Sequence, residues 1–199
     1  MFKNLSYVSI SFIYVNILGY FFHFYVSRKL GPEGYGEFMV LYSLMLTVGN
    51  ISSIFSIISV KNIVENFNEK EKILRFFRIF GLLIGGGITL IGICLSPLIK
   101  EFLKISYLPY VWVVSLCWLF IFIVAVEKGF LQANNQFGVF AFSSAFELTV
   151  RLIFAVILLS SGFYIWGAIF PSLFGIMSVL IFLLVVNKFT LIILNSRCV

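Results

Sequence analysis

Residues 108–126 have the sequence LPYVWVVSLCWLFIFIVAV, which contains no charged residue. The hydrocarbon core of a bilayer is about 30 Å thick and an α-helix rises about 1.5 Å per residue, so one crossing takes about 20 apolar residues. Other stretches of the chain also meet this requirement, at residues 5–26, 37–60, 79–99, 139–160 and 164–186. Charge is concentrated in the short gaps between them. This pattern predicts an all-α polytopic membrane protein, folded as a single bundle of six transmembrane helices.

The composition agrees with a membrane protein and leaves no room for a separate soluble domain. Hydrophobic residues make up 61% of the chain and charged residues 11%, against about 25% charged in an average soluble domain. The mean hydropathy is +1.10. The longest polar interval, residues 61–78, still contains several large apolar side chains. We expect it to form a short amphipathic connector that lies on the cytoplasmic membrane surface.

The basic residues predict the orientation of the chain, because short cytoplasmic loops are enriched in Lys and Arg. If the N-terminus is cytoplasmic, four basic residues lie in outer loops: Arg28, Lys29, Lys100 and Lys104. Nine lie inside: Lys3, Lys61, Lys70, Lys72, Arg75, Arg78, Lys128, Lys188 and Arg197. We therefore expect both termini in the cytoplasm. Orientation and anionic lipid headgroups account for the net charge of +6, so no nucleic-acid partner is predicted.

Polar side chains within the first two apolar stretches are candidates for a binding surface. In residues 5–26, Asn16, Tyr20 and His23 follow one another at helical spacing and form one stripe, which should face protein or water. In residues 37–60 there are two polar stripes, of which one contains Asn50. The other consists of Ser52, Ser56 and Ser59. The alternative is that these groups only form hydrogen bonds between helices.

The most informative pair is Glu147 and Arg151, spaced i and i+4 near the middle of the fifth stretch. A charge at that depth costs about 2.5 to 3.5 kcal/mol on insertion scales, so we expect the two residues to form an ion pair and point inward. The pair indicates a site for an anionic substrate or a coupling ion, or else a structural ion pair. Glu127 and Lys128 are interpreted as boundary residues, where the fourth helix leaves the membrane.

In the third stretch, Gly81, Gly85 and Thr89 recur at every fourth residue. Small residues at this spacing form a face against which another helix can pack closely. We therefore expect this face to lie against a neighbouring helix of the bundle.

The residue inventory argues against an enzyme. The chain contains no aspartate and a single histidine, so neither a carboxylate pair of the usual kind, nor a histidine-rich metal site, nor a Ser-His-Asp constellation is expected. We predict no catalytic residue, no cofactor and no metal site.

The gap after the first stretch, residues 28–37, has the sequence RKLGPEGYGE, in which Pro32 interrupts the helix and the glycines permit a tight reversal. It resembles the R-x-LGP-x-x-YG pattern of polysaccharide biosynthesis proteins, the O-antigen flippase-like branch of the MATE-like multidrug and oligosaccharidyl-lipid exporter superfamily. The residues that match are Arg28, Leu30, Gly31, Pro32, Tyr35 and Gly36. A weaker match to the family's G-x-x-Q…F segment involves Gly129, Gln132 and Phe137.

This resemblance implies two six-helix lobes that face each other across a cavity, of which the chain is similar to the first. It implies that the protein flips oligosaccharide linked to polyprenyl diphosphate across a bacterial inner membrane. Arg151 would then bind the diphosphate, and the polar stripes would bind sugar hydroxyls. The second lobe would come from a homodimer or a separately encoded chain. The alternatives are a non-functional flippase fragment and a six-helix substrate-binding subunit of another transporter.

Overall fold

The computed structural model describes residues 2–196, with side chains described from residue 8 to residue 191 except Asn68. Every element in this part of the chain is helical, which confirms the predicted all-α class. The elements are α1 (Phe2–Glu65), the 3-10 helix η1 (Phe67–Glu69), α2 (Lys70–Cys94), α3 (Ser96–Phe102), α4 (Leu108–Ala133), α5 (Phe137–Ser160) and α6 (Trp166–Ser196). The side chains of Lys3 and Arg197, two of the basic residues used to predict orientation, lie outside the described set.

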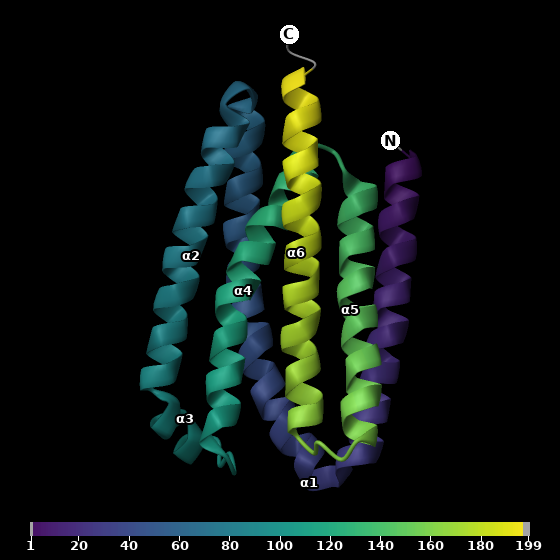
Figure 1. Cartoon of the computed structure of the whole chain (residues 1–199), viewed down its shortest axis with the longest axis vertical. Helices are drawn as coiled ribbons and strands as arrows, with labels where there is room; N and C mark the ends of the chain where they lie inside the picture. The colour runs from purple at the N-terminus through teal and green to yellow at the C-terminus, as the bar shows by residue number, and fades with distance from the viewer. Residues whose placement is uncertain (1, 197–199) are drawn as a thin grey trace.

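Helix α1 is two helices joined at Gly31, where the chain reverses direction (Figure 1). Gly31 has φ 71° and ψ 179°, a conformation that is almost restricted to glycine because a Cβ atom would clash with the backbone. Pro32 then begins the second segment, a position at which its missing N–H is not needed. The helix-hairpin turn predicted from residues 28–37 is therefore confirmed, and α1 supplies two of the long helices of the bundle.

Five helices are long and apolar enough to cross a membrane by length and composition, and the first of them is α1 with its sharp bend. Large apolar side chains cover much of the outer surface of the bundle, as expected of helices in contact with lipid. The chain is thus a multi-pass membrane protein. The start of α1 and the end of α6 lie at the same end of the bundle, at the top of Figure 1.

The predicted connector, residues 61–78, is divided differently in the structure. Helix α1 continues to Glu65, η1 forms the turn, and α2 begins at Lys70 and runs without a break into the apolar stretch. The interval therefore consists of two helix ends and a turn, and not of a separate helix lying on the surface. Each helix carries exposed ion pairs on its polar end, including Lys61 with Glu65 and Arg75 with Glu71, which makes continuation of the helix favourable.

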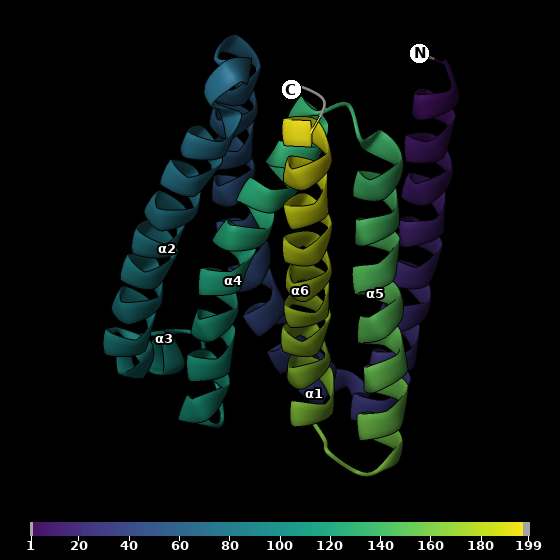
Figure 2. The same ribbon diagram turned by 45° about the horizontal axis from the view of Figure 1, so that its top comes forward.

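Helix α4 is the centre of the bundle and packs against α1, α2 and α6. Figure 2 shows it inclined between α2 on one side and α6 on the other. The predicted small-residue face of α2 lies against it: Gly81, Gly85 and Thr89 are buried, and Thr89 Oγ1 donates a hydrogen bond to the carbonyl of Ser115 over 2.9 Å. The prediction of close packing at these residues is confirmed.

Candidate functional site

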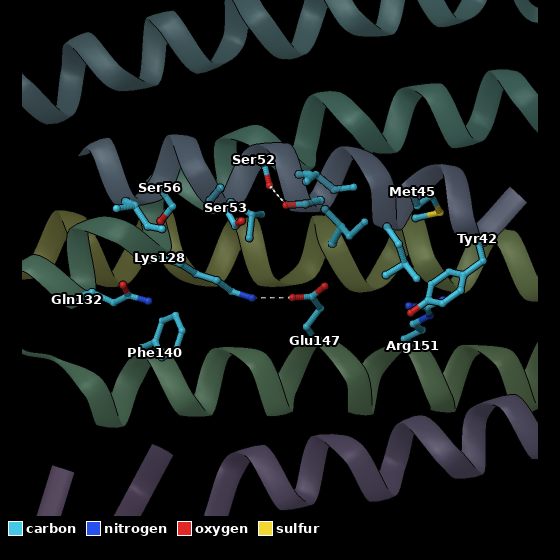
Figure 3. Close-up of a pocket in the computed structure, with 17 residues that line it drawn as sticks. Tyr42, Met45, Ser52, Ser53, Ser56, Lys128, Gln132, Phe140, Glu147 and Arg151 are labelled. Atoms are coloured by element: carbon cyan, nitrogen blue, oxygen red, sulfur yellow. Dashed lines mark hydrogen bonds and ion pairs between the residues drawn. The ribbon is translucent and has the colours of Figure 1, made fainter. Parts of the chain in front are cut away.

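A cavity of about 450 Å³ opens between the second half of α1 and helices α4, α5 and α6 (Figure 3). Its walls come from residues 42–57 of α1, 121–132 of α4, 140–151 of α5 and Ile176 of α6. Its size lies within the range of about 300 to 1,000 Å³ that is usual for small-molecule sites. Most of the lining is apolar, and the charged residues that face it are Lys128, Glu147 and Arg151.

Arg151 extends from α5 to one end of this cavity, where its guanidinium group is held between two aromatic rings. The central carbon lies 4.4 Å from the ring centre of Phe22 and 4.7 Å from that of Tyr42, so both contacts are cation–π interactions. Its Nε and Nη2 atoms are buried and make no hydrogen bond to any described residue. The structure thus places a positive charge at the cavity wall, and two of its nitrogen atoms are covered without an acceptor.

The predicted ion pair between Glu147 and Arg151 is wrong. Glu147 lies one helical turn before Arg151, but its Oε2 atom accepts a hydrogen bond from Lys128 Nζ over 2.9 Å (Figure 3). The reason is that the aromatic rings draw the arginine side chain away along the helix, while α4 brings the lysine opposite the carboxylate. The cavity therefore contains one neutralised pair and one cation.

The structure gives Glu127 a packing role that its interpretation as a boundary residue did not include. Helix α4 continues to Ala133, and the Glu127 side chain is fully buried. Its Oε2 atom accepts hydrogen bonds from Arg78 Nη2 over 2.8 Å and from Asn187 Nδ2 over 2.7 Å, which joins α2, α4 and α6. Because neighbouring residues of a helix point about 100° apart, Glu127 and Lys128 serve different sites. Lys128 lines the cavity and Glu127 does not.

Hydroxyl and amide groups line the cavity beside the charges. Ser52, Ser53 and Ser56 come from α1, and Gln132 comes from α4. The Ser53 hydroxyl donates to the carbonyl of Asn50 over 2.6 Å, so its oxygen can still accept a hydrogen bond from a ligand. Ser52 and Ser56 belong to a polar stripe that was expected to bind sugar hydroxyls, whereas the sequence did not indicate Ser53 or Gln132 as site residues.

The structure does not bring Asn16, Tyr20 or Asn50 to the cavity. Asn16 is exposed, and its Nδ2 atom donates to the carbonyl of Phe12 in its own helix over 2.7 Å. Tyr20 is 70% exposed, and Asn50 is exposed as well. Within this chain, these polar side chains face away from the bundle.

His23 has an intermediate position behind the cavity wall. Its Nδ1 atom lies 3.3 Å from the Tyr35 hydroxyl, and its ring contacts that of Tyr42, with 5.2 Å between the ring centres. Tyr42 in turn contacts Arg151. His23 therefore supports the aromatic ring that holds the arginine, and does not itself line the cavity. No group of three or more His, Cys, Asp or Glu residues within residues 2–196 is placed to hold a metal ion.

The fold resembles part of a solved transporter. The structure of a MOP superfamily transporter from Pyrococcus furiosus Vc1 matches this chain with a TM-score of 0.72 and 14% sequence identity. The match covers 91% of this chain and 43% of the other, so the chain spans less than half the length of that transporter. That protein is described by the reverse polarity of its binding pocket, which suggests a different function for it.

Two sequence comparisons complete these findings. No curated protein matches the chain significantly. The family of polysaccharide biosynthesis proteins matches it over residues 1–197, which is nearly its whole length. The chain belongs to the polysaccharide biosynthesis protein family.

Proposed function

We propose that this chain is one lobe of a flippase that moves oligosaccharide linked to polyprenyl diphosphate from the inner to the outer leaflet of a bacterial cytoplasmic membrane. In this proposal both termini are cytoplasmic, and a second lobe faces the cavity. A second copy of the chain or another polypeptide supplies that lobe. Two bodies are required because alternating access consists of one body rocking against the other around a shared site.

The observation that carries the proposal is the state of Arg151. The guanidinium group lines the cavity without a carboxylate partner among the described residues, and two of its nitrogen atoms are buried without an acceptor, which is costly in a membrane protein. A phosphate offers the matching acceptors, and arginine pairs with phosphate through charge-assisted hydrogen bonds. The rings of Phe22 and Tyr42 hold the group in one orientation before the substrate arrives.

The remaining lining suits the sugar part of such a substrate. Serine hydroxyls and the Gln132 amide are neutral donors and acceptors, which suit the hydroxyl groups of a carbohydrate. The apolar lining beside them suits the first part of a polyprenyl chain. At about 450 Å³ the cavity of one lobe holds the diphosphate and a small part of the glycan, and the facing lobe would enclose the rest.

The proposal is tested by surface-polysaccharide export in cells that lack this chain and receive variants of it. We expect Arg151→Ala to abolish export and Arg151→Lys to restore only a fraction of it, because lysine keeps the charge but loses the planar fork that lies between the rings. Arg75→Ala is the matched control, since the Arg75 side chain is 75% exposed and lies far from the cavity lining.

Two results would contradict the proposal. Export that is unchanged when the chain is deleted would reject the flippase function. Full export by an Arg151→Ala variant present at the wild-type level would remove Arg151 from the binding site.

A further inference from the structure

The Lys128–Glu147 pair is placed unlike the other ion pairs in the described part of the chain. The pairs Lys61–Glu65, Lys72–Glu69 and Arg75–Glu71 are exposed. The Arg78–Glu127 pair, with side chains 30% and 0% exposed, joins α2 to α4 and does not line the cavity. Lys128 and Glu147 both line the cavity, with side chains 19% and 28% exposed. The pair is therefore partly open to whatever enters the cavity.

Helix packing alone does not account for this pair. Two well-packed apolar side chains usually stabilise a helix contact as well as an enclosed ion pair does, because each charge loses its hydration. The contact between α4 and α5 at this point is also small, since both helices make their main contacts elsewhere. What the pair does provide is a second cation at the cavity wall, kept neutral while the cavity is empty.

We infer that Glu147 is a displaceable counter-ion, which holds Lys128 in the empty cavity and yields it to the second phosphate group of the substrate. Lys128 and Arg151 would then bind one phosphate each. This inference rests on the proposed function, and it adds a second substrate-binding cation and a carboxylate that controls it.

The charges of the site support this exchange. Lys128, Glu147 and Arg151 carry one net positive charge between them, which matches one phosphate group. A diphosphate that joins a lipid to a sugar carries two negative charges, and its phosphorus atoms are covalently linked, so once Arg151 binds one phosphate the other competes with Glu147 at close range. The freed carboxylate stays one helical turn from Arg151, on the same face of α5. The substrate thus meets two cations, whereas the empty cavity exposes only one.

The exchange predicts a specific gain of affinity. In Glu147→Gln the lysine has no competing carboxylate, so the diphosphate should bind more tightly. The probes are farnesyl diphosphate and farnesyl monophosphate, titrated against the full chain in detergent micelles. In this variant the diphosphate does not have to replace the charge-assisted hydrogen bond between Lys128 and Glu147. Its affinity should therefore increase about tenfold. The monophosphate, which Arg151 alone can bind, should change much less. The double variant Lys128→Gln/Glu147→Gln should lose the gain.

Lys128→Gln tests the same point without depending on whether Glu147→Gln folds. It should reduce the preference for farnesyl diphosphate over the monophosphate to near one. Glu127→Gln is the matched control: it removes the neighbouring interhelical ion pair, which does not line the cavity, and should leave the preference unchanged.

The outcomes separate this inference from the proposed function. Weaker diphosphate binding by Glu147→Gln, a gain that persists in the double variant, or an unchanged preference in Lys128→Gln would each overturn the displaceable counter-ion. If Arg151→Ala still lowers binding in the same assay, the failure concerns the counter-ion alone. If Arg151→Ala and the wild type bind both probes equally, the proposed function fails with it.

Discussion

Glu127 offers a stringent test of the structure, because its burial was not expected from the sequence. Replacing it by alanine leaves Arg78 without two charge-assisted hydrogen bonds and Asn187 without one. Removing one member of a buried ion pair typically costs about 3–5 kcal/mol. The Arg78 side chain is 30% exposed and regains part of its hydration, so we expect a loss of stability near 3 kcal/mol for Glu127→Ala.

The measurement is thermal unfolding of the chain in detergent micelles. At about 2–4 °C per kcal/mol, a ratio taken from soluble chains of this length, the midpoint should fall by about 6–12 °C. The double variant Arg78→Met/Glu127→Met should be more stable than the single one, because it removes the charge as well as its partner. An exposed residue without these partners would tolerate alanine within about 0.5 kcal/mol. A midpoint shift under 2 °C for Glu127→Ala would therefore refute the buried three-helix contact.

Two pairs of glycines allow further predictions by the same unfolding measurement. In Gly85→Leu the new Cβ atom would lie 3.2 Å from the backbone of Leu119, and the side chain should push α2 away from α4 at a cost of about 1–3 kcal/mol. Gly86 has open space at the Cβ position, so Gly86→Leu should unfold like the wild type. Gly31→Ala should cost about 1–3 kcal/mol because of the positive φ at the hairpin, while Gly36→Ala, in regular helix, should be neutral or slightly stabilising. Equal midpoints within either pair would contradict the geometry at that position.

Much of the fold could be predicted from the sequence because a bilayer restricts the choice of structure. Backbone groups in lipid must be satisfied within the segment, so each long apolar stretch has to be a helix. The hairpin was predictable for a similarly local reason, since Gly31 and Pro32 together favour a sharp reversal. The exact ends of the helices were not, because the polar residues 61–78 continue two helices by forming ion pairs on them.

The direction of the small polar side chains could not be predicted in the same way. Asn16 bonds to the carbonyl of Phe12, Ser43 to that of Val40, and Thr47 to that of Ser43, each within its own helix. A side chain whose polar group is hydrogen-bonded within its own helix can face outward at little cost in free energy. A polar stripe therefore indicates a helix that tolerates either environment. The stripe with Asn50 faces away from the bundle and the stripe with Ser52 faces into it, although Ser52 also donates to a carbonyl of its own helix, that of Gly49.

Charged side chains are more informative about direction, because hydrogen bonds within a single helix turn do not offset the free energy of placing a charge in lipid. Glu127, Lys128, Glu147 and Arg151 all lie inward, as the cost of charge in lipid requires. Their pairing, however, depends on how helices cross, and the spacing i, i+4 fixes only what lies on one helix. Lys128 competes successfully with Arg151 for Glu147 because α4 places it opposite the carboxylate, and the rings of Phe22 and Tyr42 compensate the arginine. The unpaired donors of Arg151, and with them the candidate site, follow from that competition between helices.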